Sequence, residues 1–149
     1  MVESALVSEA FRQCETDGMY LTLESVPKGR VRAMVRVAQE DIAALSLLEG
    51  AGLHNTMFKI AYDALHTLAG ALLLAQKIKP KNHQCLFAYV CSKFPALRID
   101  WGICEQMRSK RNKLHYYGSV VRSAEWKGLE VQMLLYAEAL CSEIAGLLD

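Results

Sequence analysis

The sequence contains few prolines and glycines, the residues that are abundant in extended and flexible chains. Only three prolines and nine glycines occur among its 149 residues, which excludes collagen-like and linker-like chains. Hydrophobic residues make up 52% of the sequence, and this fraction is far above that of a disordered segment. A chain of this length can bury a sizeable core, so we expect one principal domain.

Long apolar runs are also absent. The longest run, Leu68 to Ala75, falls well short of the ~20 residues that a membrane-spanning helix needs. No cationic leader followed by an apolar run and a small-residue cleavage site opens the chain, as a secretory signal would. We therefore expect neither membrane insertion nor secretion.

The cysteines show no pairing pattern. Their number is odd and no C-x-x-C pair occurs, so we interpret them as reduced thiols of a cytosolic protein, where structural disulfides are rare. His83-x-Cys85, followed by Cys91, leaves no convincing fourth ligand for zinc. The sequence predicts a cytoplasmic protein without a metal or a cofactor. The five cysteines are Cys14, Cys85, Cys91, Cys104 and Cys141.

The formal net charge is only +1, but the basic residues are unevenly distributed. Nine Lys or Arg residues and two acids lie between Lys77 and Lys113, which leaves eight basic and fourteen acidic residues elsewhere. A positive surface on an acidic body can concentrate anions such as nucleic-acid phosphates. From the charge counts alone, a solvated helix face that binds no ligand is an equally good interpretation. The lysines that we assign to nucleic-acid binding are Lys77, Lys79, Lys81, Lys110 and Lys113.

Helical periodicity dominates from about residue 30 onward. Apolar residues recur at threes and fours, and Pro, Gly and capping residues separate the segments. Asn55 and Asp100 suit the N-cap position, and Gly118 can supply a left-handed helix end. Because the connections are short, neighbouring helices should pack antiparallel. The five expected helices cover about residues 31–45, 55–77, 82–94, 100–117 and 126–147.

The first 29 residues are harder to assign. Residues 3–14 suit a short helix, whereas residues 19–23 are equally compatible with an extended arm. No other segment alternates with period two, and we find no internal repeat. The sequence therefore predicts an all-α fold, with an N-terminal helix or arm over residues 1–29 and an up-and-down bundle of four to five helices over residues 30–149.

The helix expected over residues 100–117 carries the clearest candidate site. At ~100° of rotation per residue, two arginines, an amide and an imidazole fall in one sector, apart from the apolar seam of the helix. Lys110 and Lys113 point elsewhere, towards water. The residues of this polar stripe are Arg108, Arg111, Asn112 and His115.

This set of side chains suits chemistry on a phosphodiester. A guanidinium can hold a phosphate through two parallel hydrogen bonds and stabilise developing charge. An imidazole near neutral pH can accept or donate a proton. With RNA, the substrate's own 2′-hydroxyl can be the nucleophile, so the mechanism needs no metal. The alternative is structural: the two arginines pair with acids of a neighbouring helix, and His115 packs within the bundle.

Other chemically interesting residues are assigned to the core. We expect His66 to make a polar contact inside the bundle, and Cys104 to be a small buried residue beside the stripe. Trp101 and Trp126 are expected in the core or at a dimer interface.

The polar stripe resembles the signature of HEPN domains. Arg108, six intervening residues and His115, with Tyr117 two residues further on, are similar to the R-x(4–6)-H and H-x-Y motifs of that family. The resemblance covers about residues 30–147. Three preceding segments resemble the family's paired long helices and its basic turn with a histidine, namely residues 38–45, 60–66 and 79–83.

The resemblance implies a dimeric helical bundle in which the Arg/His stripes of two subunits face each other across a cleft. Many HEPN members are metal-independent ribonucleases that act as toxins or in defence, often neutralised by a partner nucleotidyltransferase. Others keep the bundle as a non-catalytic module that binds a nucleotide, RNA or a protein. We expect the first function, with the second as the alternative. The expected catalytic residues are Arg108 and His115, assisted by Arg111, Asn112 and Tyr117.

Overall fold

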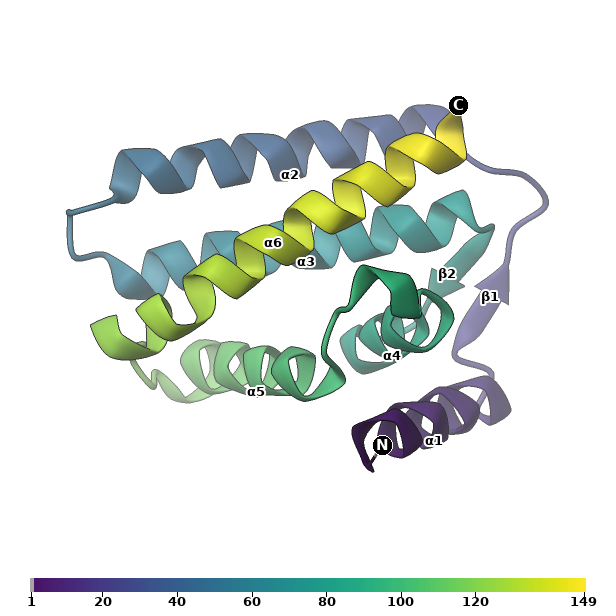
Figure 1. Ribbon diagram of the computed structural model, residues 1–149, viewed down its shortest axis with the longest axis horizontal. Coiled ribbons are helices and arrows are strands. Elements are labelled where there is room, and N and C mark those ends of the chain that lie inside the picture. The colour runs from purple at the N-terminus through teal and green to yellow at the C-terminus, as the bar shows by residue number, and fades with distance from the viewer. Residues whose placement is uncertain (1) are drawn as a thin grey trace.

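The structure is a computed structural model that describes residues 2–149, with side chains from Ser4 onward, and it is mostly helical (Figure 1). The all-α prediction is confirmed at this level, with the addition of two three-residue strands. The elements in chain order are α1 (Val2–Thr16), β1 (Tyr20–Thr22), α2 (Lys28–Leu48), α3 (His54–Ala75), β2 (Ile78–Pro80), α4 (His83–Lys93), the short 3-10 helix η1 (Pro95–Leu97), α5 (Trp101–Tyr117) and α6 (Ser123–Leu148).

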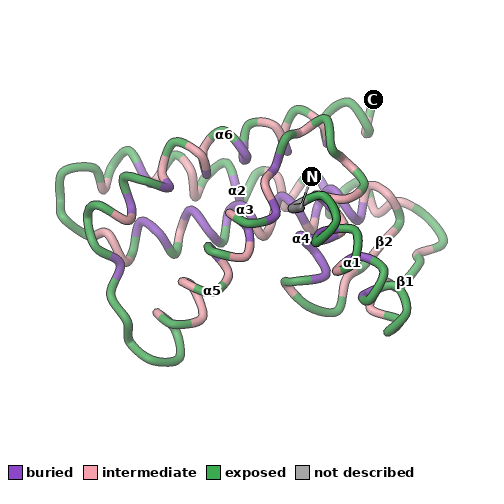
Figure 2. Tube along the Cα trace, turned by 60° about the horizontal axis from the view of Figure 1, so that its bottom comes forward, coloured by how far each residue is buried: buried purple, intermediate pink, exposed green. Residues whose placement is uncertain are grey.

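Helix α3 is the centre of the bundle. It packs against α2, α6, α4 and α5, and α2 runs antiparallel to it across a short connection (Figure 1). A helix that is apolar on most of its circumference must be covered by neighbours, and Figure 2 shows buried positions along the length of α3. Its largest fully buried side chains are Phe58, Tyr62, Leu68, Leu72 and Leu73.

Several helix ends follow from local sequence. Asn82 caps α4 by accepting a hydrogen bond from the Cys85 amide, and Asp100 caps α5 in the same way. Gly118 ends α5 at φ 65°, in the left-handed region that glycine tolerates. The prediction that Asn55 is an N-cap was wrong. Its side chain instead accepts a hydrogen bond from the Val121 amide, which ties the segment after α5 to the start of α3.

The N-terminal segment combines the two conformations that the sequence left open, a helix followed by an extended strand. β1 pairs antiparallel with β2, with Leu21 opposite Lys79. Beside this pair, α1 packs on α4, and the rings of Phe11, Tyr20 and Tyr89 form a cluster with centroids 5.3–5.8 Å apart. Strand β2 was not predicted because three residues are too few to establish a period of two.

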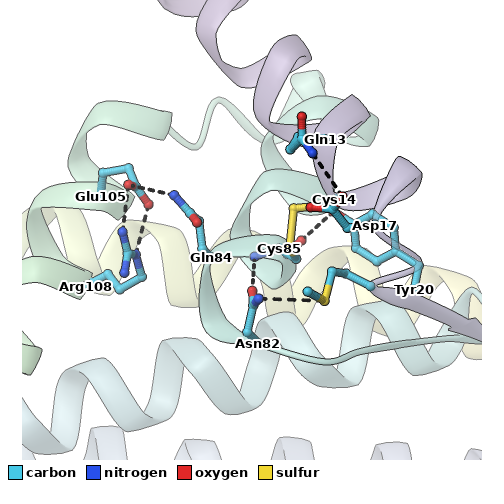
Figure 3. The surroundings of a disulfide bond; sticks show 10 residues. Gln13, Cys14, Asp17, Tyr20, Asn82, Gln84, Cys85, Glu105 and Arg108 are labelled. Carbon is cyan, nitrogen blue, oxygen red and sulfur yellow. Dashed lines mark hydrogen bonds and ion pairs between the residues drawn. A yellow bond between two sulfur atoms is a disulfide. The ribbon is translucent and has the colours of Figure 1, made fainter.

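A disulfide joins α1 to α4. Cys14 is bonded to Cys85, with Cα atoms 5.7 Å apart and a sequence separation of 71. The Tyr20 hydroxyl donates a hydrogen bond to the Cys85 carbonyl at 2.7 Å (Figure 3). The interpretation of all five cysteines as reduced was therefore wrong. The cytoplasmic location, which rested on it, loses that support and stays a prediction.

Two helices, α3 and α6, are long and apolar enough to cross a membrane by length and composition. The most apolar stretch of α3 is 67% buried inside the bundle, as is also typical of the core helix of a soluble protein, and that of α6 is 28% buried. This criterion alone is weak evidence for a membrane.

Candidate functional site

A cavity of about 330 Å³ lies between the start of α4 and the polar stripe of α5. We call it the α4–α5 cavity. The Asn82 cap fixes the first turn of α4, so that the residues around this cap face α5. The cavity is lined by Asn82, His83, Gln84, Arg108, Arg111, Asn112 and Tyr116.

Three of the five predicted catalytic residues meet in this cavity, namely Arg108, Arg111 and Asn112. The other two do not line it. His115 is exposed, and its ring packs edge-on against Tyr116 at 4.9 Å between centroids. Tyr117 is 81% exposed at the end of the helix.

Arg108 is held by an acid of its own helix. Its Nε and Nη2 donate to the two carboxylate oxygens of Glu105 at 3.1 and 2.9 Å. Gln84 of α4 donates to the same carboxylate at 3.3 Å, so one acid connects the two helices that form the cavity (Figure 3). Arg108 therefore forms an ion pair with an acid, as the structural interpretation of the stripe expected, although the acid belongs to α5 itself and not to a neighbouring helix.

Arg111 differs from Arg108 in this respect. Among the side chains from Ser4 to the C-terminus, no carboxylate forms an ion pair with it. Its positive charge lowers the pKa of both His66 and His83, and Arg111 and His83 line the same cavity. A half-buried guanidinium without a protein anion is a ready binding site for a ligand anion.

The imidazole inside the cavity is His83. Its Nδ1 lies 3.1 Å from the hydroxyl of Tyr62, and its ring centroid is 3.8 Å from that of His66. Burial is the main cause that lowers the pKa of His83, and Arg111 and Arg108 add to it. His83 is therefore neutral at pH 7 and able to accept a proton.

This histidine was missed as a site residue, although one signal pointed to it: the basic turn that resembles HEPN domains ends at His83. In the structure its ring lies against the rings of Tyr62 and His66, which are four residues apart and therefore lie on one face of α3. The expectation that His66 makes a polar contact inside the bundle did not anticipate that its ring lies against a residue of the candidate site.

The pKa of His66 predicts a pH-dependent stability. Burial, His83 and Arg111 lower this pKa to about 4, whereas the unfolded chain takes up the proton near pH 6.5. Between these values the unfolded state binds more protons, so acidification favours unfolding. We expect the free energy of unfolding to fall by about 3 kcal/mol from this group between pH 7 and pH 4.

Urea denaturation of wild-type protein and of His66→Phe at several pH values measures this effect. The variant should lose stability less steeply between pH 6.5 and pH 4. His115→Phe, which removes an exposed imidazole, is the matched control and should follow the wild type. Parallel pH profiles for wild type and His66→Phe would contradict the prediction.

The predicted nucleic-acid-binding lysines have different surroundings. Lys77, Lys79 and Lys81 are exposed on and beside β2, and Lys113 is exposed on α5. The prediction that Lys110 points into water was wrong. Its ammonium forms an ion pair with Glu125 of α6, and its side chain is mostly buried.

The α4–α5 cavity therefore combines a free guanidinium, a second guanidinium held in place by Glu105, amide groups and a neutral imidazole. This combination can bind an oxyanion and accept a proton beside it. In comparisons with known proteins, no family, no curated protein and no solved structure matches this chain.

Proposed function

We propose that this protein is a HEPN-type, metal-independent ribonuclease that binds the phosphodiester backbone of RNA in the α4–α5 cavity. One observation carries the proposal: Arg111 lines the cavity without a protein carboxylate, beside a neutral imidazole. A phosphate there gains a charge-assisted hydrogen bond from Arg111 without displacing an existing ion pair. The resemblance to HEPN domains supplies the reaction class.

In the proposed reaction, the 2′-oxygen of a ribose attacks the adjacent phosphorus. The 2′-hydroxyl proton passes to an imidazole, the bond from phosphorus to the 5′-oxygen breaks, and that oxygen takes a proton from solvent. The products are a 2′,3′-cyclic phosphate and a 5′-hydroxyl. Arg111, with Arg108 beside it, stabilises the charge that develops on the phosphoryl oxygens, and Asn112 orients the phosphate by hydrogen bonding.

Two imidazoles compete for the role of proton acceptor. His83 lines the cavity and is neutral, and in the tautomer that donates Nδ1–H to Tyr62, its Nε2 has a free lone pair. His115, the histidine of the family signature, lies outside the cavity with Tyr117. The proposal assigns the role of proton acceptor to His83 of the subunit that binds the phosphate. His115 and Tyr117 would instead act from the polar stripe of the second subunit, which faces this one in the dimer. His83→Ala and His115→Ala in one cleavage assay separate these roles.

We further propose a homodimer that covers the C-terminal end of α5. Tyr116, Tyr117 and Val120 are 68%, 81% and 64% exposed there, beside His115. A two-fold pairing would bury these apolar side chains and bring two stripes together. The nucleotidyltransferase partner rests on the resemblance alone and stays a prediction.

Sedimentation velocity tests the dimer. We expect a dimer at micromolar concentration, and we expect Tyr117→Ser together with Val120→Ser to shift the distribution towards monomer, because the pair loses its apolar contact area. Leu6→Ser, at an exposed leucine of α1, which lies at the opposite end of the molecule from the C-terminus of α5 (Figure 1), is the control and should leave the dimer intact. A monomeric wild-type protein would contradict this part of the proposal.

A second function is favoured by a different observation. Arg108 already donates two hydrogen bonds to Glu105, and His115 stands outside the cavity. In a binding module, an immobilised Arg108 and a free Arg111 would hold a nucleotide or RNA phosphate without cleaving it. The candidate ligand and the cavity are the same, and only the chemical step differs.

RNA cleavage in the presence of a chelator tests the proposed function. Purified protein should convert single-stranded RNA of mixed sequence into fragments that end in 2′,3′-cyclic phosphate, identified by mass spectrometry, at an unchanged rate in excess EDTA. RNA that is bound but remains intact would favour the binding module. Protein that neither binds nor cleaves RNA would overturn both.

A further inference from the structure

A second cavity adjoins the candidate site at His83. It encloses about 290 Å³ between α2, α3, β2 and the start of α4, close to the lower end of the range for small-molecule pockets. We call it the β2 cavity. Asn82 and His83 line both this cavity and the α4–α5 cavity, so the two meet at these residues.

The inner walls of the β2 cavity suit a flat, partly polar group. Met34, Leu74 and Leu86 contribute apolar surface, and Gly70 of α3 leaves room that a side chain would fill. The ring of His66 completes the wall, and its centroid lies 3.8 Å from that of His83, with the two ring planes tilted by 35°. Aromatic or imidazole rings beside aliphatic surface are the environment in which nucleobases stack.

His66 also offers hydrogen bonds to a ligand. Within residues 4–149, the two ring nitrogens of His66 have no hydrogen-bond partner. In the same residues, every fully buried side-chain nitrogen or oxygen does have a partner, so the His66 nitrogens are not fully buried. Both ring nitrogens therefore keep access to solvent, and the space that His66 lines is the β2 cavity. With its pKa lowered to about 4, the ring is neutral and presents one donor and one acceptor, as the edge of a base requires.

Cations surround the mouth of this cavity. Arg30 of α2, Lys79 of β2 and Lys81 line it, and all three are exposed. No ion pair engages them in the described part of the chain. They are placed to contact a phosphate that continues away from the base.

We infer that the β2 cavity is a nucleobase subsite, which holds one base of a nucleoside whose neighbouring phosphate lies in the α4–α5 cavity. The inference rests on the proposed function, because the phosphate at Arg111 sets the position of the strand. A base can enter the cavity only when it is unpaired, so the subsite selects single-stranded RNA over duplex. A free dinucleotide offers the same chemistry, and the experiment separates the two sources.

The test compares RNA with and without bases. Two six-residue 2′-O-methyl strands, one of uridines and one abasic, carry the same backbone charge, and neither can be cleaved through a 2′-hydroxyl. Fluorescence anisotropy should show that wild-type protein binds the uridine strand about tenfold more tightly or more, as expected for the contacts of one base. A 2′-O-methyl diuridine competitor should be much weaker than the hexamer if longer RNA is the ligand, and equally strong if a dinucleotide is.

Gly70→Leu fills the cavity without changing any charge. Gly70 and Met34 both line the cavity, and a Cβ at position 70 would lie 3.4 Å from the Met34 Cε. A leucine there therefore adds side-chain volume at the cavity wall, while leucine favours a helix more than glycine does. This variant should bind both strands with the affinity that wild type shows for the abasic strand. Gly128→Leu, at a helical position with nothing within 4 Å of an added Cβ, is the matched control and should behave as wild type.

The outcomes separate this inference from the proposed function. If wild type binds both strands equally, or if Gly70→Leu keeps the preference for uridine while folded, the β2 cavity is not a base subsite although the phosphate site stands. If wild type binds neither strand, both are overturned. The preference of the wild type for bases requires no variant, so a folding defect in Gly70→Leu would not remove the test.

Discussion

Arg111→Ala is expected to lower kcat/KM for RNA cleavage by about 10²-fold or more, the effect of removing one donor that stabilises charge in a transition state. Arg111 is the guanidinium of the α4–α5 cavity that no described carboxylate engages. Its full charge is therefore available to the phosphoryl oxygens. The loss should appear in single-turnover cleavage of a fluorescent RNA.

Two further variants make this result specific. Arg111→Lys should recover only part of the activity, because an ammonium cannot form the two parallel hydrogen bonds of a guanidinium. Arg12→Ala removes an exposed guanidinium of α1 that does not line the cavity, and it should cleave nearly as fast as wild type. Equal losses in Arg111→Ala and Arg12→Ala would show that Arg111 contributes only general positive charge.

Loss of the disulfide is expected to lower the free energy of unfolding by about 4 kcal/mol, according to the chain-entropy estimate for a loop of this length. The bond between Cys14 and Cys85 closes a loop with a sequence separation of 71 residues. Both cysteines are buried, and α1 packs on α4 beside them. For a chain of this size the loss corresponds to a melting temperature about 10 °C lower.

Calorimetry of wild type and of the variant with Cys14→Ser and Cys85→Ser measures this difference. Cys141→Ser, at a half-buried free thiol, is the control and should melt close to wild type. Thiol titration of the denatured, unreduced protein should count three thiols. A count of five, with equal melting temperatures, would contradict the disulfide.

The helices were predictable because their information is local. Apolar residues at threes and fours define α2 to α6, and Asn82, Asp100 and Gly118 specify ends through contacts within five residues. The strand pair and the disulfide join residues near position 20 to residues near position 80. No periodicity in either segment records that contact, so the sequence alone could not supply it.

The sequence indicates which side of α5 carries the candidate site, but not how far along the helix the cavity extends. The helical rotation correctly grouped Arg108, Arg111 and Asn112 on one face of α5. His115 shares that face but lies three residues beyond Asn112, or about 4.5 Å further along the axis, and it falls outside the cavity that the start of α4 forms. Which imidazole enters the cavity depends on tertiary packing between α3, α4 and α5.

The most direct test of the central claim is an NMR titration of the arginine side chains with an uncleavable 2′-O-methyl RNA. If the α4–α5 cavity binds the phosphodiester, the Nε–Hε resonance of Arg111 should shift and saturate with the RNA, while that of Arg12, exposed on α1, should not move. RNA binding that leaves the Arg111 resonance unchanged, or an absence of binding at millimolar RNA, would contradict the account.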